Sequence, residues 1–322
     1  MATERPILIV GCPRSGTTLL RDLLRAHSRI TIPDETAVLP ALLRAHGDPA
    51  DARAARRLAS DLLVCNGVRL WGLDLTPPDL EHHRSFSALV AAVYGEWARL
   101  EDKPRWGEKT PQYVHELPAM RQVFPDAQVV HVIRDPRAVT ASLLGRSWGP
   151  ATARSAALAW RECVLAGRRD GPPLGSDGYH ELRYEELVAD PERVLRALCE
   201  FLGERYEPQM LRPNRLTMQP GRPLPWNSPG AETSVVPGPA ADDALGPRDR
   251  AAVAWEAGDL MEELGYGPVG PRRPPYPGER ARNAIVDRAA WARYRLTTWD
   301  RGPRLRETLA VRRSLIARRT RA

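Results

Sequence analysis

The chain alternates between short apolar runs and amphipathic segments. The first run, PILIVGC at 6–12, is apolar almost throughout, as expected of a strand buried on both faces of a sheet. A second buried strand is predicted at 127–135 (AQVVHVIRD), and 179–187 (YHELRYEEL) indicates a third strand followed by a turn. Between the first two, leucines recur at helical spacing and predict an amphipathic helix that begins near Ser15.

Further helices are predicted from the same periodicity. Pro136 suits the first turn of a helix after the second strand, and Gly203 and Gly265 are typical helix stops. The other helices are expected at about 53–64, 86–100, 152–168, 191–202 and 248–264. Alternating strands and helices predict an α/β fold with a mostly parallel sheet.

Two regions show little periodicity. Residues 207–247 are rich in proline and glycine, which favours a long surface loop or lid. A proline-rich linker then opens 269–322, which continues as an arginine-rich helical segment. We therefore expect one domain over 1–268 and an extension over 269–322. No apolar run reaches the roughly 18 residues of a membrane span, and no signal peptide is apparent.

The loop after the first strand, GCPRSGTT, has the glycine spacing of a phosphate-binding loop. Gly16 allows close backbone approach, and the free N–H groups of a helix start favour an anion. Arg14 supplies a cationic fork, while Thr17 and Thr18 add hydroxyl donors. Thr17 stands where a nucleotide-hydrolysing enzyme carries a lysine. The loop thus predicts a phosphate site with an unusual source of positive charge.

The sequence PRSGTTLL resembles the 5′-phosphosulfate loop of sulfotransferases that use 3′-phosphoadenosine 5′-phosphosulfate. This resemblance implies a P-loop-like, three-layer α/β/α fold with a central parallel sheet. It also implies that residues 14–18 hold the 5′-phosphosulfate. A sulfuryl group carries less charge than a terminal phosphoryl group, so the resemblance implies transfer without the magnesium that kinases use.

A second anion site is expected near the middle of the chain. In VIRDPRAVTASLL, Arg134 follows a strand and Ser142 lies eight residues later on the next helix. The arrangement resembles the family's 3′-phosphate site. Arg137 is the nearest rival and is interpreted as a solvated residue at the helix start. Tyr184, in LRYEELVADP, resembles a family tyrosine that lies near the nucleotide; the alternative is a half-buried tyrosine of the sheet.

A base must take the proton of the acceptor hydroxyl. Glu35, in IPDETAVLP, is the candidate because it follows the loop helix closely. The stretch resembles the EET segment of tyrosylprotein sulfotransferases, in which the second glutamate acts as base. Asp34 is the neighbouring alternative. Ala37 stands where those enzymes carry an acceptor-contacting arginine, which argues against a peptide-tyrosine acceptor.

Lys109 is one of two lysines in the chain; the other, Lys103, is expected to be solvated. Lys109 lies in WGEKTPQYV, a stretch that we interpret as turn-like and ended by Pro111. Related enzymes carry a lysine at a similar distance before the 3′-phosphate arginine, so the resemblance implies that its ammonium reaches the bridging oxygen of the phosphosulfate. The alternative is a surface lysine paired with Glu108.

The histidines are weaker candidates for the base. His27 ends the first helix, where a partly buried cap is expected, and His131 lies within an apolar strand, as a core histidine would. His82 and His83 have no metal-ligand partners at useful spacing and are expected at the surface. No metal site is predicted.

Composition refines the picture. The 322 residues carry a net charge of +7, yet the segment from Pro271 onward holds 15 arginines against 4 acidic residues, so the remaining body is mildly acidic. No nucleic-acid module is apparent, and we favour packing of this basic segment on the body or on a second subunit, as in a homodimer, over contact with a polyanion. Four scattered cysteines without a C-x-x-C spacing are consistent with a reducing cytoplasm.

These patterns together predict a cytoplasmic sulfotransferase that uses 3′-phosphoadenosine 5′-phosphosulfate. The acceptor is expected to be a hydroxyl of a small molecule, a carbohydrate or a phenol, and no nucleic-acid partner is expected. Two alternatives stay open: a P-loop kinase, and a non-catalytic protein that binds a nucleotide or a polyanion. The residues assigned to chemistry are Arg14, Glu35 and Lys109, and those assigned to the nucleotide are Arg14, Ser15, Gly16, Thr17, Thr18, Arg134, Ser142 and Tyr184.

Overall fold

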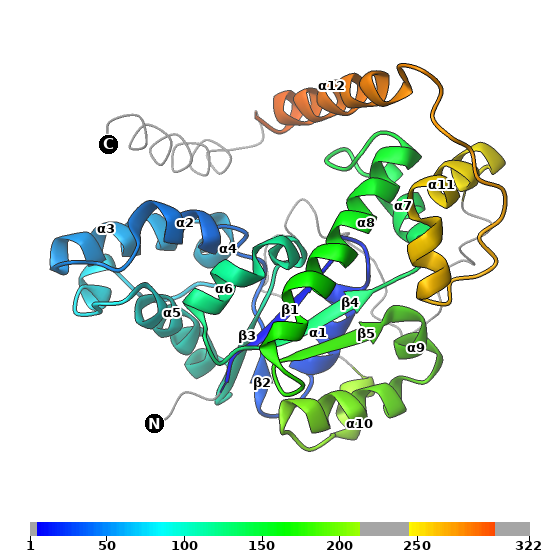
Figure 1. Ribbon diagram of the computed structural model, residues 1–322. Coiled ribbons are helices and arrows are strands. Elements are labelled where there is room, and N and C mark those ends of the chain that lie inside the picture. The colour runs from blue at the N-terminus through cyan, green and yellow to red at the C-terminus, as the bar shows by residue number, and fades with distance from the viewer. Residues whose placement is uncertain (1–4, 213–244, 300–322) are drawn as a thin grey trace.

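The computed structural model describes residues 5–212 and 245–299. Its centre is a five-stranded parallel sheet in the order β2-β3-β1-β4-β5 (Figure 1). The strands are β1 (Ile7–Gly11), β2 (Ile30–Thr31), β3 (Arg105–Lys109), β4 (Gln128–Ile133) and β5 (Tyr179–Arg183). The three predicted strands are therefore confirmed, although the turn expected after the third is a short helix (Tyr184–Ala189), whereas β2 and β3 were not predicted.

Helices cover both faces of the sheet. The α-helices are α1 (Thr17–Arg25), α2 (Leu39–His46), α3 (Ala52–Leu63), α4 (Asn66–Arg69), α5 (Phe86–Leu100), α6 (Leu117–Val123), α7 (Pro136–Leu144), α8 (Ala153–Asp170), α9 (Tyr184–Ala189), α10 (Pro191–Leu202), α11 (Pro247–Glu263) and α12 (Glu279–Trp299). Short 3₁₀ turns are η1 (Pro77–Leu80), η2 (Pro111–Glu116), η3 (Pro172–Leu174) and η4 (Pro208–Leu211).

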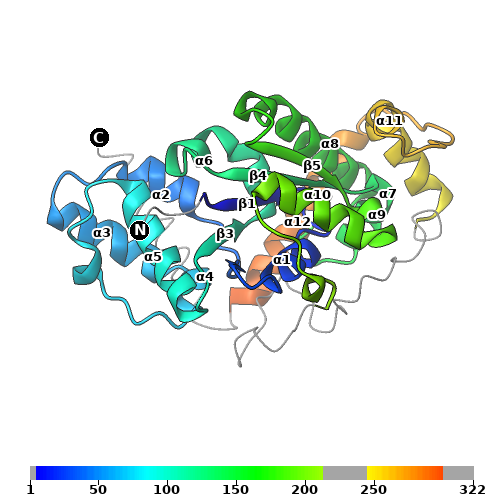
Figure 2. The ribbon, with the colours of Figure 1, turned by 90° about the horizontal axis from the view of Figure 1, so that it is seen from below.

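Two hydrophobic clusters lie on opposite faces of the sheet because successive strand residues point in opposite directions. Leu8 and Val10 of β1 pack with α5, α6, α8 and α11, whereas Ile7 and Ile9 pack with α1 and α10. Figure 2 shows α1, α9 and α10 together on the second face. The three-layer α/β/α architecture with a parallel sheet is thus confirmed.

The helices expected from periodicity correspond to α3, α5, α8, α10 and α11, each displaced by at most two residues at an end. The helix stops are also confirmed, because Gly203 and Gly265 have left-handed φ angles of 75° and 72° just past α10 and α11. The helices α2 and α6 were not predicted. Both carry a proline at their second residue, a position that tolerates proline because its N–H has no helical partner.

The turn-like interpretation of the stretch around Lys109 is wrong, because Lys109 is the last residue of β3. All five residues of this strand are buried although three of them are charged. Each charge has a partner: Arg105 pairs with Glu204, Lys109 with Glu35, and Glu108 accepts a hydrogen bond from Tyr94. Paired charges can be buried without an apolar pattern, which explains why the strand was missed.

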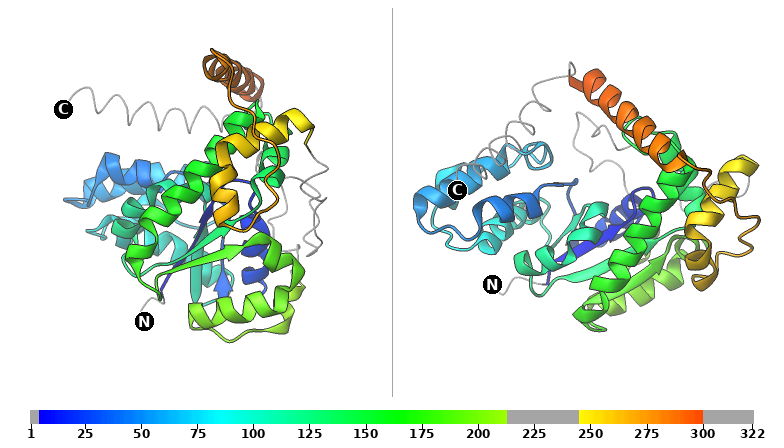
Figure 3. Two further views of the ribbon diagram at one scale, coloured as in Figure 1. Left: turned by 45° about the vertical axis from the view of Figure 1, so that its right-hand side comes forward. Right: turned by 45° about the horizontal axis from the view of Figure 1, so that its top comes forward.

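The first turn of α12 is tied to the body. Glu279 is buried and accepts from Arg273 at 2.5 Å and from Arg154 of α8 at 3.5 Å. Arg154 also contacts Glu256 of α11. Figures 1 and 3 show α12 at the end of α8 away from the amino edge of the sheet. These contacts of Glu279 pack the beginning of the basic segment on the body, which is the arrangement favoured from the sequence. The domain boundary at residue 268 stays a prediction.

Most of the predicted 207–247 loop, residues 213–244, lies outside the described residues, and so do residues 300–322. The beginning of that loop is the short turn η4. Among residues 5–212 and 245–299, no helix has both the length and the apolar character needed to cross a bilayer.

Candidate functional site

The loop after β1 turns sharply into α1. Arg14 and Gly16 both have left-handed backbone angles, with φ of 77° and 95°. Gly16, which has no side chain, occupies the N-cap position of α1. No side chain of Gly16 can therefore cap the first N–H groups of α1, which belong to Thr17 and Thr18. Because these groups lie at the positive end of the helix dipole, they favour an anion in front of them.

The next feature of this loop is the close fit of Ser15 and Gly16. Ser15 is fully buried, and within the described residues its Oγ has no hydrogen-bond partner. Buried hydroxyls are normally paired, so a ligand oxygen would complete this one. A Cβ added to Gly16 would lie 2.3 Å from the ring of Tyr184. Only glycine allows the loop to close against that ring.

The two anion-binding clusters expected from the sequence meet at the carboxyl edge of the sheet. Arg14 Nε donates to Ser142 Oγ at 3.0 Å, and Arg134 Nη1 donates to the carbonyl oxygen of Arg14 at 3.2 Å. Arg134 directly follows β4, and Ser142 lies on α7. Because β1 and β4 are adjacent parallel strands, their ends bring the two segments together.

Tyr184 forms a wall shared by both clusters. It is the first residue of α9 rather than a residue of the sheet. The guanidinium carbon of Arg134 lies 4.1 Å from the centroid of its ring, a cation–π contact, and the same ring closes against Gly16. The Arg134 carbonyl is in turn fixed by Trp160 Nε1 at 2.8 Å. The arginine is therefore held at both its backbone and its side chain.

Arg146 is a member of this cluster that the sequence patterns did not single out. It lies just after the end of α7, four residues beyond Ser142, and within the described residues its buried Nε has no hydrogen-bond partner. The pKa of Arg14 is lowered to about 10, first by burial and then by the positive charges of Arg146 and Arg134, while the negative charge of Glu35 opposes this shift. The guanidinium groups of Arg14, Arg134 and Arg146 thus create a positive electrostatic potential, and this potential favours the binding of an anion.

The interpretation of Arg137 as a solvated residue is wrong. Its side chain is largely buried and bonds to both carboxylate oxygens of Asp135, at 2.6 Å from Nη2 and 3.0 Å from Nε. It also donates to the carbonyl of Pro268 at 3.2 Å. Arg137 thereby connects the start of α7 with the segment after α11, while Arg134 faces the loop.

Lys109 and Glu35 lie side by side beneath the phosphate loop. Lys109 is completely buried, Glu35 is 9% exposed, and the Lys109 ammonium donates to Glu35 Oε1. The same ammonium lies 3.4 Å from Thr18 Oγ1. Asp34, the alternative base, instead accepts from Arg21 at 2.6 Å. A carboxylate, an ammonium and the loop hydroxyl are thus within one small space.

The remaining histidines lie elsewhere. His131, in the middle of β4, is buried and shares a hydrogen bond with the Tyr179 hydroxyl at 2.7 Å; burial lowers its pKa to about 4, so it is neutral near pH 7. His27 Nε2 lies 2.8 Å from the carbonyl oxygen of Arg205. In the part of the chain that the structure describes, no cluster of three or more His, Cys, Asp or Glu residues could hold a metal ion.

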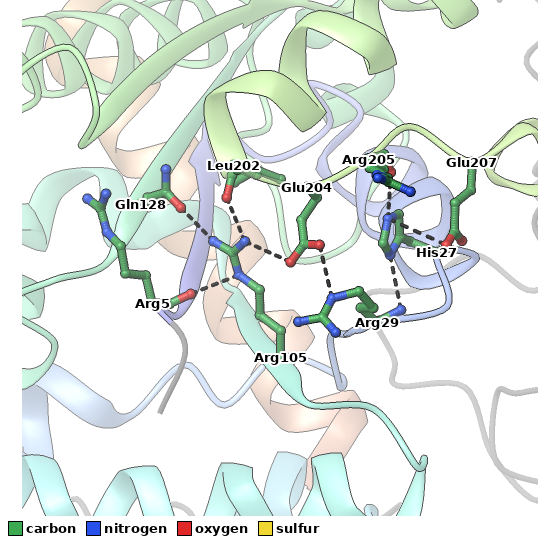
Figure 4. A pocket seen from close by; sticks show the side chains of 10 residues that line it. Arg5, His27, Arg29, Arg105, Gln128, Leu202, Glu204, Arg205 and Glu207 are labelled. Atoms are coloured by element: carbon green, nitrogen blue, oxygen red, sulfur yellow. Dashed lines mark hydrogen bonds and ion pairs between the residues drawn. The ribbon is translucent and has the colours of Figure 1, made fainter. Parts of the chain in front are cut away.

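A pocket of about 540 Å³ opens at the opposite, amino edge of the sheet (Figure 4). Arg105, the first residue of β3, lies at its centre. Its guanidinium is already bonded to the carbonyl oxygens of Arg5 and Leu202 and to the side chains of Glu204 and Gln128 (Figure 4). Because the Arg105 guanidinium is occupied by these structural bonds, we place the candidate functional site at the carboxyl edge of the sheet and not at this pocket.

The fold defines a class of protein, in which a three-layer α/β/α domain has a parallel sheet and its first strand leads through a glycine-containing loop into a helix. The family model described as "Sulfotransferase family" matches residues 6–208, more than half of the chain. The chain therefore belongs to the sulfotransferase family, which confirms the resemblance read from the loop.

Individual relatives agree with this assignment. The chain is 26% identical over 287 residues to a protein-tyrosine sulfotransferase of Drosophila melanogaster, with 82% of this chain and 52% of the relative covered. It is 25% identical to protein-tyrosine sulfotransferase A of Caenorhabditis elegans, covering 81% and 67% of the two chains. The chain thus spans about half the length of the first of these relatives.

Among solved structures, the sulfotransferase domain of the Synechococcus PCC 7002 olefin synthase is similar, with a TM-score of 0.56 and 24% identity. The similarity covers 83% of this chain and 98% of that domain. It extends the agreement in fold beyond the residues that the family model matches.

Proposed function

We propose that this chain is an enzyme that transfers a sulfuryl group from 3′-phosphoadenosine 5′-phosphosulfate to a hydroxyl of a small-molecule, carbohydrate or phenolic acceptor. The observation that carries the proposal is the contact of Arg14 with both Ser142 and Arg134. This contact joins the loop at residues 14–18 to the pair Arg134 and Ser142. A single nucleotide with an anionic group at each end would bind to both clusters.

The loop would hold the 5′ end of the donor. The N–H groups of Thr17 and Thr18 and the Ser15 hydroxyl, which has no partner among the described residues, would bind the phosphosulfate. Arg134 and Ser142 would hold the 3′-phosphate, and Arg146 adds a third positive charge beside them. Guanidinium groups suit this task because their planar fork matches phosphate oxygens.

Glu35 is the proposed base. It takes the proton of the acceptor hydroxyl while the acceptor oxygen forms a bond to sulfur, and the bond between sulfur and the bridging oxygen breaks. The products are a sulfate ester and adenosine 3′,5′-bisphosphate, and the proton on Glu35 later passes to solvent. Lys109 and Arg14 stabilise the charge that develops on the departing phosphate. The contacts of Lys109 with Glu35 and Thr18 support these neighbouring roles.

The first experiment is a thermal-shift titration with adenosine 3′,5′-bisphosphate. A ligand at 100 times its Kd stabilises the folded state by about 2.7 kcal/mol. A screen for transfer of labelled sulfate should follow, with phenols, sugars and a tyrosine peptide in separate wells. Transfer to any hydroxyl supports the proposal. Binding without transfer favours a non-catalytic protein, and ATP-dependent phosphorylation without use of phosphosulfate favours a kinase.

The role of Glu35 is tested by Glu35→Gln. A positioned base contributes roughly 10²–10⁴-fold in rate, so we expect a loss of kcat in that range with bisphosphate binding unchanged. The matched control is Asp34→Asn, since Asp34 pairs with Arg21 instead. Full turnover in the Glu35 variant contradicts its assignment. The cytoplasmic location and the homodimer stay predictions.

A further inference from the structure

The segment that carries Glu35 has no regular secondary structure of its own. Residues 32–38 connect β2 to α2 without helix or strand. Ala37 has a left-handed φ of 55°, which is unfavourable for a residue with a Cβ. A segment of this kind keeps one conformation only if contacts from other elements hold it. The orientation of Glu35 therefore depends on those contacts.

Hydroxyl groups from η2 and from the residue that joins it to β3 hold the backbone of this segment. The N–H of Ala37 donates to Thr110 Oγ1 at 3.4 Å, and the N–H of Leu39 donates to the Tyr113 hydroxyl at 3.0 Å. On another side, α4 packs so closely that a Cβ added to Gly67 would lie 2.2 Å from the carbonyl oxygen of Glu35. These contacts hold the segment at Glu35, Ala37 and Leu39.

These hydroxyls converge on one buried carboxylate, that of Glu108. Thr110 Oγ1 and the Tyr94 hydroxyl both donate to it, and Thr36 Oγ1 lies 3.3 Å from its Oε1 and 3.0 Å from the Tyr113 hydroxyl. A hydroxyl has one proton to donate and lone pairs with which to accept. Because the Thr110 hydroxyl donates its hydrogen bond to Glu108, a lone pair of its oxygen stays available to accept the backbone N–H of Ala37.

The alternation of side chains along β3 explains how Glu108 and Lys109 act together. Neighbouring strand residues point to opposite faces of a sheet. Lys109 contacts Glu35, and Glu108 contacts the next residue, Thr36. The last two residues of β3 thus hold two consecutive residues of the segment, Glu35 and Thr36, from opposite faces of the strand.

We propose that Glu108 is a positioning residue that aims the Glu35 carboxylate at Lys109 and the phosphate loop through the Thr36 and Thr110 hydroxyls. The proposal rests on the proposed function of Glu35 as base. Glu108 is 1% exposed, so its carboxylate is enclosed by the protein. Its effect is exerted only through the conformation of the segment.

The charge of Glu108 makes this positioning dependent on pH. Burial raises the pKa of Glu108 to about 7; the negative charge of Glu35 raises it as well, while bonds from Thr110 and Tyr94 and the charge of Lys109 lower it. The phenols that face it, on α5 and η2, have pKa values raised well above 10, so they stay neutral donors. Glu108 thus gains its full acceptor capacity as the pH rises through neutrality.

The two lysines of the chain provide a direct test. Protein labelled with ¹⁵N-lysine gives one side-chain signal from Lys109, which reports the contact with Glu35, and one from Lys103. The Lys103 ammonium donates to the carbonyl oxygens of His27 and Ile30 at 2.9 and 3.0 Å and serves as an internal reference. The experiment needs neither a nucleotide nor an acceptor.

Two variants disturb the positioning without touching Glu35 or Lys109. Glu108→Gln removes the charge at nearly constant shape, and Thr36→Val removes the linking hydroxyl. In both we expect the Lys109 signal to shift by an amount comparable with the shift in Glu35→Gln, with the Lys103 signal unchanged. In the unmodified protein the Lys109 signal should also move as the pH passes about 7, and this movement should vanish in Glu108→Gln.

Glu116→Gln is the matched control, since Glu116 is a surface carboxylate that pairs with Arg44. A Lys109 signal that stays at its original position in Thr36→Val, or in a folded Glu108→Gln, overturns the proposal. If Glu108→Gln does not fold, Thr36→Val decides alone. Failure of the proposed function would show differently, as absence of bisphosphate binding or of sulfate transfer in the unmodified protein, with the Lys109 shifts retained.

Discussion

The buried carboxyl of Glu108 predicts an unusual dependence of stability on pH. Its pKa is raised from 4.5 to about 7 in the folded protein. Between these two values the unfolded chain releases the proton of Glu108 while the folded protein retains it. The free energy of unfolding therefore falls as the pH rises from about 4.5 to about 7, and the loss is complete above that range.

The magnitude follows from the size of the pKa difference. One pKa unit corresponds to about 1.36 kcal/mol, so the raised pKa costs the folded state about 3 kcal/mol above pH 7. For a chain of this size such a change corresponds to a shift in Tm on the order of 5 °C. Glu108→Gln is neutral at every pH and removes this contribution.

The assay is thermal unfolding of the unmodified protein and of Glu108→Gln from pH 5 to pH 8. Other titrating groups are common to both proteins, so the difference between their Tm values isolates Glu108. We expect this difference to move in favour of the variant by about 5 °C as the pH rises. At pH 5 the two proteins should be similar, because a protonated carboxyl and an amide each offer a donor and an acceptor.

Glu116→Gln again provides the control, and its Tm difference should be small because exposed ion pairs contribute little. Parallel curves for Glu108→Gln and the unmodified protein would refute the reasoning. That outcome would mean that Glu108 has the same pKa in the folded and the unfolded chain, in spite of its burial.

Two further predictions concern the anion site. Arg146→Gln should weaken binding of adenosine 3′,5′-bisphosphate roughly 10- to 100-fold, measured by calorimetry, since a hydrogen bond to a charged group contributes about 1.5–3 kcal/mol. The surface variant Arg121→Gln is the control and should bind normally. Equal affinities of Arg146→Gln and the unmodified protein would show that Arg146 does not belong to the site. Gly16→Ala should abolish the thermal shift with bisphosphate, because the new Cβ would lie 2.3 Å from the Tyr184 ring. Gly47→Ala, also at positive φ but with open space around it, should retain the shift, and a retained shift in Gly16→Ala would contradict the close fit.

The fold and the turn of the loop after β1 were predictable because their signals are local. A doubly buried strand needs a continuous apolar run, and β1 and β4 have one. A loop that approaches a phosphate needs glycine where the backbone is left-handed, and Gly16 meets that need within a few residues of Arg14. Such requirements are visible in a short stretch of sequence.

The missed parts depend on distant partners. The charged strand β3 is buried because Arg105 and Lys109 find carboxylates about seventy to a hundred residues away, and no local pattern encodes those pairs. Arg146 is one arginine among many, and only the fold places it beside Arg14. The hydroxyl network around Glu108 likewise joins residues from three separate elements.

The residues that the sequence patterns missed are also those on which the proposed chemistry depends. A carboxylate enclosed at the end of β3 costs stability near neutral pH, and an apolar residue there would pack without that cost. An apolar residue could not, however, accept hydrogen bonds from Thr110 and Tyr94, and the irregular segment that carries Glu35 would lose the hydroxyl orientation that holds it. A fold that retains such a carboxylate exchanges stability for the orientation of one neighbouring side chain, as functional sites commonly do. The stability gain expected for Glu108→Gln and the loss of Glu35 alignment in the same variant are therefore two consequences of one buried charge.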